Sequence, residues 1–186
     1  ITKEDFQEIG TLFEKVAKCD VIVHFAAVNR STDERLLLRS NKKIIDDLID
    51  CMHKLDKYPR FINISSIHEV QDSAFGMSKR YSRRSLERYY HQFPEQLTTI
   101  IAPNIFGAFC KPNYNSVVAT FCHSLITGNA LNVNGASRIR LVYVDDLVDI
   151  IISTLSNERA IFTQHDFQGV DISIRELADK LKYFHS

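Results

Sequence analysis

The sequence predicts an α/β fold built around a parallel sheet. Short apolar runs, of the kind found in strands buried on both faces, alternate with longer segments of helical periodicity. This alternation is typical of helices that pack on the faces of a parallel sheet. With 186 residues, of which 45% are hydrophobic, the chain is long enough for one well-packed globular domain.

The first half of the chain is expected to contribute two helices and two strands. Apolar residues recur at helical spacing up to Lys18, and a short apolar run follows at once. Pro59 marks the end of a second, longer helical segment. In chain order we expect a helix over 3–18, a strand over 20–27, a helix over 33–57 and a strand over 60–66.

The second half continues the pattern, and proline, glycine and capping residues mark the ends of its elements. Gly128 suits the position just after a helix, while Asp145 and Ser173 suit the position just before one. Pro94 and Pro103 end the elements before them. In chain order we expect a helix over 75–93, a strand over 97–102, a helix over 115–127, a strand over 141–144, a helix over 145–155, and a final helix after a strand that ends near 172.

The composition argues against several classes of protein. Lysine plus arginine equals aspartate plus glutamate, at 23 each, so nothing favours nucleic acid or an anionic membrane as a partner. No apolar run reaches the roughly 20 residues of a membrane-spanning helix, and no secretory signal is visible. Four scattered cysteines without a C-x-x-C pair suit a reducing compartment, so we expect a cytoplasmic protein. We expect no metal site, because adjacent Cys122 and His123 would point about 100° apart on a helix.

The residues with the clearest chemical meaning follow the strand over 60–66. Ser66 ends that strand, and Phe75 and Lys79 open the next helix with a spacing of four residues. Residues four apart lie on one face of a helix, so the Lys79 ammonium would lower the pKa of a phenol at position 75. Taken alone, Ser66 and Lys79 are more simply a strand-end serine and a solvated lysine.

The surrounding residues resemble those of a known family. Ser65-Ser66-Ile67 followed by Phe75-Gly76-Met77-Ser78-Lys79 is similar to the active-site segment of extended short-chain dehydrogenase/reductases of the NAD-dependent epimerase/dehydratase type. More narrowly, the chain resembles the reductase domain of the capsular-polysaccharide UDP-sugar 4-ketoreductases that make UDP-N-acetyl-L-fucosamine. The resemblance extends over residues 19–30, Pro103 to Gly107 and Tyr143 to Val148. The match peculiar to this subgroup is Cys110 to Ser116 followed by Ala119 to Cys122.

The resemblance implies a Rossmann-like, doubly wound parallel sheet with a small substrate-binding lobe, in one domain over 1–186. Residues 1–103 would mainly bind the cofactor, NADPH in preference to NAD, and residues 104–186 would mainly bind a UDP-sugar. Hydride would be delivered to C4 of a 4-keto-6-deoxy UDP-sugar while Ser66 polarises the ketone and Lys79 orients the ribose. The residues implied to bind the cofactor are Ala26, Ala27, Asn41, Lys79 and Pro103. Those implied to bind the substrate are Ser66, Asn104, Lys111, Asn113, Asn115 and Arg140. A homodimer through the helix over 75–93 is also implied.

Simpler interpretations stay open for the substrate-side residues. The stretch from Lys111 to Asn115 also suits a solvated turn, since proline and asparagine are turn formers. Arg140 could be an ordinary exposed arginine between strands. Asp145 and Asp146 could form a carboxylate pair, but a cap at Asp145 is the better interpretation.

Two departures from the family pattern bear on activity. Phe75 stands where the family has a proton-donating tyrosine. Tyr81 is no easy substitute, because it lies about 200° around the helix from Lys79 and would point away from the site. His68 is the alternative donor. None of the six glycines forms G-x-G-x-x-G or G-x-x-G-x-x-G. We therefore expect the first strand, its glycine loop and the first helix to lie upstream of Ile1. The sequence predicts a reductase impaired in this chain; the alternatives are a non-catalytic nucleotide-sugar-binding or interaction protein, or a gene remnant.

Overall fold

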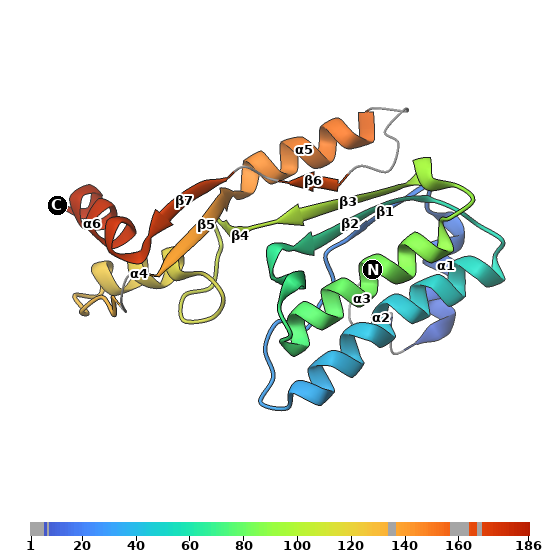
Figure 1. The fold of residues 1–186 in the computed structure, drawn as a ribbon, viewed down its shortest axis with the longest axis horizontal. Coiled ribbons are helices and arrows are strands. Elements are labelled where there is room, and N and C mark those ends of the chain that lie inside the picture. Colours follow the sequence, from blue (N-terminus) through green and yellow to red (C-terminus); the bar gives the residue numbers. More distant parts are fainter. Residues whose placement is uncertain (1–5, 7, 134–136, 157–163, 167–168) are drawn as a thin grey trace. The chain divides into compact units, whose positions relative to one another are not determined.

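The computed structural model describes residues 6, 8–133, 137–156, 164–166 and 169–186, and it divides the chain into two compact units (Figure 1). One unit comprises the chain up to Ile101 together with 154–166, and the other comprises 102–153 together with the C-terminal segment. Each unit has its own sheet and its own buried side chains. None of the described helices is long and apolar enough to span a membrane.

The first unit is a parallel sheet with helices on one face (Figure 1). The strand order is β1-β2-β3-β6, and the β1–β2 and β3–β6 pairs are parallel. The strands are β1 (Val21–His24), β2 (Arg60–Ser66), β3 (Leu97–Ala102) and β6 (Gln164–Asp166). The helices on that face are α1 (Ile9–Lys18), α2 (Glu34–Lys54) and α3 (Ala74–Tyr89), and the 3₁₀ turns are η1 (Ile67–Val70) and η2 (Pro94–Gln96).

The core of this unit lies between the helices and the sheet. Apolar residues at helical spacing meet the inward side chains of the strands, which removes the apolar area from water. The side chains with at most 1% of their surface exposed include Leu12, Val16, Ile45, Leu48, Met52, Phe61, Leu86, Tyr90 and Leu97.

The strand β1 is buried on one face only. Ile22 is 6% exposed, whereas Val21 and Val23 on the other face are 38% and 37% exposed. The expectation that this run is buried on both faces is therefore wrong, because the helices that contact it all lie on one side. The strand also ends at His24 and does not extend to Ala27.

The second unit has a small mixed sheet. Its strands pair in the order β4-β5-β7, with β4 and β5 parallel and β5 and β7 antiparallel. They are β4 (Asn104–Phe106), β5 (Arg138–Tyr143) and β7 (Val170–Ser173). The helices are α4 (Val117–Ile126), α6 (Ile174–His185) and α5 (Val144–Ser156), of which the residues up to Ser153 belong to this unit. The buried cluster consists of Phe121, Leu141, Ile172, Leu177 and Ala178.

Two of the predicted helix ends are confirmed, together with the hydrogen bonds that form them. Gly128 has φ +70°, and the N–H groups of Gly128 and Asn129 donate to the carbonyls of Leu125 and Ser124, which closes α4 in a Schellman motif. Ser173 caps α6, because its hydroxyl accepts from the N–H of Glu176 and the Glu176 carboxylate accepts in return.

The prediction that Asp145 caps a helix is wrong. The helix α5 begins one residue earlier, at Val144, so Asp145 and Asp146 lie inside its first turn. There the two carboxylates still favour the helix through its dipole.

The helix α3 is also shorter than expected, since it ends at Tyr89 and not at Phe93. Tyr90 follows as the C-cap residue, and its buried side chain donates a 2.7 Å hydrogen bond to the carbonyl of Pro59.

Candidate active site

Ser66 lies where the strand β2 passes into the turn η1. Its hydroxyl oxygen accepts a hydrogen bond of 3.2 Å from the N–H of His68 and so caps the turn. Because this bond uses a lone pair, the hydroxyl proton stays available to a ligand, and no acceptor for it occurs among the described residues. Ser66 is only half-buried, so a ligand can reach it.

Phe75 and Lys79 lie on one face of α3, as their spacing predicts. The Lys79 ammonium is 5.8 Å from the centre of the Phe75 ring, within the range of a cation–π contact. It donates a 3.0 Å hydrogen bond to the carbonyl of Ile64, two residues before Ser66 in β2. Lys79 is therefore not the solvated lysine of the simpler interpretation, since only 9% of its surface is exposed.

Burial changes the proton affinity of two groups at this place. Desolvation lowers the pKa of Lys79 to about 8, because the interior disfavours the ammonium. Desolvation and then the Lys79 charge lower the pKa of His24 to about 3. His24 is therefore neutral at physiological pH, which agrees with its expected place in the core against Phe61.

The stability of the protein should fall as the pH drops below 6.5, the ordinary pKa of His24. Below that value the unfolded chain takes up a proton at His24, whereas the folded chain does so only near pH 3. The contribution of His24 to the free energy of unfolding should be fully retained above pH 6.5 and should decline below it, by up to about 1.4 kcal/mol per pH unit. Urea denaturation between neutral pH and about pH 5 measures this slope. The same slope in His24→Gln would contradict the assignment.

Asn41 connects the loop after β1 to α3. Its amide oxygen accepts a 2.6 Å hydrogen bond from the N–H of Val28, and its amide nitrogen donates to the Val28 carbonyl and to the Ser78 hydroxyl. The side chain is 5% exposed. Asn41 therefore holds the loop in place, and its predicted contact with a cofactor stays a prediction.

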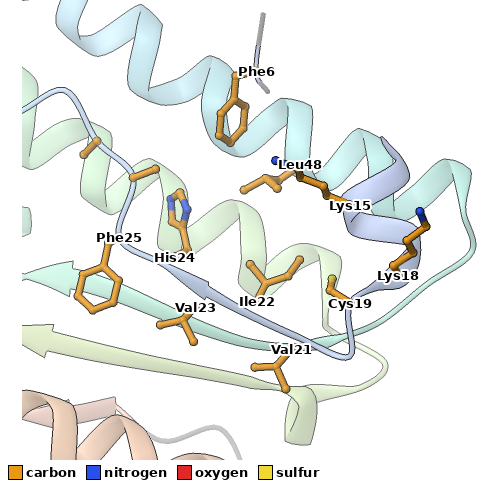
Figure 2. A pocket seen from close by; sticks show the side chains of 12 residues that line it. Phe6, Lys15, Lys18, Cys19, Val21, Ile22, Val23, His24, Phe25 and Leu48 are labelled. Carbon is orange, nitrogen blue, oxygen red and sulfur yellow. The ribbon is translucent and has the colours of Figure 1, made fainter. Parts of the chain in front are cut away.

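A cavity runs along β1 and the loop that follows it. Its volume is about 860 Å³, and Ala26 and Ala27 line it together with side chains of α1 and β1. Figure 2 shows Ile22 and His24 on the helix side of the strand, with Val21, Val23 and Phe25 on the opposite side. The two alanines expected to contact a cofactor thus border an open, mainly apolar space.

These residues fit the nicotinamide end of a dinucleotide. Lys79 uses one N–H in its bond to Ile64, and its other two can meet ribose hydroxyls. The small side chains of Ala26 and Ala27 leave room for a flat ring at the end of β1. The sequence contains no glycine motif for the pyrophosphate.

The second unit contains the residues predicted to bind the substrate other than Ser66. Asn104 lies in β4 and donates a 3.0 Å hydrogen bond to the backbone carbonyl of Arg140 in β5. The Arg140 side chain is exposed, and Pro103 is buried just before β4. Contact of any of these residues with a ligand stays a prediction.

The loop before α4 is exposed but anchored. Lys111, Asn113 and Asn115 all face solvent, and the Lys111 ammonium is 5.7 Å from the centre of the Tyr114 ring. Asn113 has φ +56°, and its N–H donates to the Thr120 hydroxyl of α4 at 2.9 Å. Asparagine tolerates this left-handed conformation, so the loop is a built turn that presents polar side chains.

Two features of the first unit were not found by sequence reasoning. A second cavity of about 570 Å³ lies beside Phe75 and is lined by the polar segment 29–32 and by Ser73. Glu69 is a buried carboxylate on the turn after Ser66. The sequence could have suggested the first, since the segment lies in the loop between β1 and α2. The burial of Glu69 depends on contacts with α3.

The parallel sheet, the strand-end serine and the lysine on the following helix define a Rossmann-like protein of the short-chain dehydrogenase/reductase class. Residues 1–168 match the NAD dependent epimerase/dehydratase family, and the chain therefore belongs to that family. The predicted α/β fold and the predicted family are both confirmed.

Relatives with known names point to nucleotide sugars. The chain is 31% identical over 183 residues to a UDP-2-acetamido-2,6-beta-L-arabino-hexul-4-ose reductase of Pseudomonas aeruginosa, a match that covers 96% of this chain and 48% of that protein. It is 27% identical to the capsular polysaccharide assembling protein CapF of Staphylococcus aureus, with a TM-score of 0.77 over 99% of this chain and 48% of that one. DesIV, a dTDP-glucose 4,6-dehydratase of Streptomyces venezuelae, has the same fold, with a TM-score of 0.82 at 22% identity over 95% of this chain and 61% of that one. The chain spans about half the length of the curated reductase.

Proposed function

We propose that this chain is the reductase part of a UDP-sugar 4-ketoreductase of bacterial capsule or O-antigen polysaccharide synthesis. Its reaction is the NAD(P)H-dependent reduction of a 4-keto-6-deoxy UDP-sugar, with NADPH as the favoured cofactor. The observation that carries the proposal is the burial of Lys79 against β2 beside the Ser66 turn. The 31% identity to a named 4-ketose reductase supports the substrate class.

The residues of this chain would divide the work as follows. Lys79 would hold the ribose through its ammonium protons, and Ala26, Ala27 and Pro103 would border the cofactor. Ser66 would donate its free hydroxyl proton in a hydrogen bond to the ketone oxygen and so stabilise the charge that develops there. The cofactor, when bound, supplies the hydride that reaches C4.

The substrate would be held by side chains of the second unit, of which all but the half-buried Asn104 are exposed. Asn104 and the asparagines of the 111–115 loop offer amides for sugar hydroxyls, and Lys111 and Arg140 offer charge for the diphosphate. The assignment of residues 1–103 mainly to the cofactor and 104–186 mainly to the substrate belongs to this proposal. So do a homodimer through α3 and a cytoplasmic location.

Phe75 favours a second candidate function. A phenyl ring has no proton to donate, and general acid catalysis is typically worth about 10²–10⁴ in rate. The reductase is therefore impaired in this proposal. The alternative is a protein that binds a nucleotide sugar or a partner without turnover, or a gene remnant; His68 on the η1 turn is the candidate donor that would keep the enzyme active.

A ligand titration tests the proposed function. NADPH binding is followed through the fluorescence of its reduced nicotinamide, in the 186-residue chain and in the whole protein that carries it, with and without UDP-sugar. We expect saturable binding to the whole protein, weakened about tenfold or more by Lys79→Met, which removes a buried charge-assisted donor. Lys54→Met, on the exposed side of α2, is the matched control and should bind normally.

The outcomes separate the two functions. NADPH binding that depends on Lys79 supports a reductase. UDP-sugar binding without NADPH binding would favour the non-catalytic alternative, and failure to bind either ligand would overturn the proposal.

A further inference from the structure

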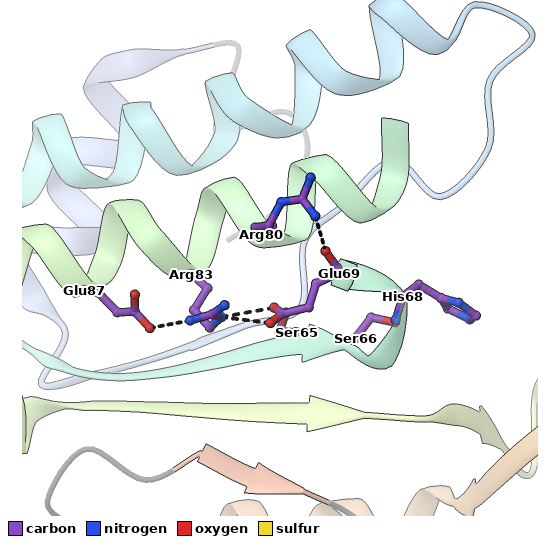
Figure 3. A network of polar contacts seen from close by, with 7 residues as sticks. All are labelled: Ser65, Ser66, His68, Glu69, Arg80, Arg83 and Glu87. Carbon is purple, nitrogen blue, oxygen red and sulfur yellow. Dashed lines mark hydrogen bonds and ion pairs between the residues drawn. The ribbon is translucent and has the colours of Figure 1, made fainter. Parts of the chain in front are cut away.

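The turn η1 carries a buried carboxylate that the proposed chemistry does not use. Glu69 is 5% exposed and lies three residues after Ser66. Its side chain accepts a 2.7 Å hydrogen bond from the Ser65 hydroxyl and two bonds, of 3.0 and 3.2 Å, from the Nε of Arg83 on α3. Figure 3 shows Arg83 reaching from the helix to this carboxylate.

A second contact ties the same turn to the same helix. Arg80, one turn before Arg83 on α3, donates a 2.9 Å hydrogen bond to the backbone carbonyl of Glu69 (Figure 3). The side chain and the main chain of Glu69 are thus both held by α3. The helix also approaches the turn closely at Gly76, which lies against the carbonyls of His68 and Gln71.

Burial of the Glu69 carboxylate costs free energy. A carboxylate withdrawn from water loses hydration free energy that one ion pair seldom restores in full. Arg83 does not need Glu69 for charge balance, because it also forms a 2.7 Å pair with Glu87, its neighbour one turn on. Glu69 therefore gives Arg83 a second, buried partner and ties this arginine of α3 to the turn.

The geometry links this buried carboxylate to Ser66. Side chains of successive strand residues point to opposite faces, so Ser65 and Ser66 at the end of β2 face in opposite directions. The bond from Ser65 to Glu69 fixes the direction of the Ser65 side chain, and the Ser66 side chain then points to the opposite face. Phe75 and Lys79 lie on the same helix as Arg80 and Arg83.

We propose that Glu69 is a positioning residue: it clamps the Ser66 turn to α3 and so sets where the Ser66 hydroxyl lies relative to position 75 and Lys79. The significance of this clamp for catalysis rests on the proposed function. The clamp itself is tested without any ligand, so its failure is distinguishable from a failure of the proposed function.

Hydrogen exchange in Glu69→Gln tests the clamp. The reporters are the amides of His68 and Gln71, which are bonded within the turn to the Ser66 hydroxyl and the His68 carbonyl. We expect both to exchange about tenfold faster, and the His68 imidazole resonances to shift, while the amide of Leu55 at the end of α2 is unchanged. Glu87→Gln is the matched control, because it removes the other carboxylate of Arg83 and should leave the turn unaffected.

A second variant keeps the proposal falsifiable if Glu69→Gln does not fold. Arg83→Lys retains a cation near Glu69 but loses the planar fork, and we expect a smaller acceleration confined to the same two amides. Uniform acceleration of all amides would show a merely structural role for Glu69 and would overturn the proposal. Unchanged exchange at His68 and Gln71 in both variants would overturn it as well.

Discussion

Replacement of Phe75 by tyrosine should raise the reductase rate of the whole protein by about 10²–10⁴. The ring at position 75 already faces the Lys79 ammonium at 5.8 Å, so a phenol there gains a hydroxyl without a new side-chain direction. The nearby positive charge favours the phenolate and should lower the pKa of the new phenol below its ordinary value. A proton donor would then stand beside Ser66 and Lys79.

Two measurements check this result. The oxidation of NADPH by a 4-keto-6-deoxy UDP-sugar gives the rate, and the ultraviolet absorbance of the phenolate gives the titration of the added tyrosine. Phe109→Tyr, at a fully exposed phenylalanine, is the matched control and should titrate normally. If Phe75→Tyr titrates like this control and produces no activity, the missing hydroxyl does not account for the proposed impairment.

Gly76→Ala should destabilise the protein by about 1–3 kcal/mol, although the same exchange normally stabilises a helix. A Cβ at Gly76 would overlap the carbonyl oxygen of His68 and lie 2.6 Å from that of Gln71. Both are backbone atoms of the turn that carries Ser66, so α3 or the turn must move. The substitution would therefore also disturb the site.

Gly10→Ala should change the free energy of unfolding in the opposite direction, and it serves as the control. Gly10 lies in α1, and nothing approaches the position of its added Cβ within 4 Å. Alanine there should stabilise the protein by up to about 1 kcal/mol through helix propensity. Urea denaturation of both variants measures the two free energies. If Gly76→Ala leaves the free energy of unfolding as high as Gly10→Ala does, the turn and the helix are not closely packed.

Local sequence patterns determined most of the elements of the fold. The strands β2 and β3 and the helix α2 lie where apolar spacing and Pro59 predict them, because periodicity and breakers act over a few residues. The caps at Ser173 and Gly128 were predictable for the same reason. The strands β4 and β6 were not predicted, since each has only three residues and depends on a partner strand.

The spacing of Phe75 and Lys79 also follows from the sequence, because four residues return to the same helix face. The sequence could not show that Lys79 is buried and bonded to Ile64, which is 15 residues away. Nor could it show that Asn41 bonds Ser78 across 37 residues. These contacts exist only once α2 and α3 pack on the sheet.

The sequence by itself therefore determined the fold class, the family resemblance and the identity of the chemical groups at the site. The tertiary structure decided which of those groups are buried, and with that the pKa of Lys79 and of His24. It also decided that Glu69, 14 residues from Arg83 in the chain, meets it beside the Ser66 turn. The reason is physical: desolvation and hydrogen bonding depend on which surfaces pack together, and that information is not local in the chain.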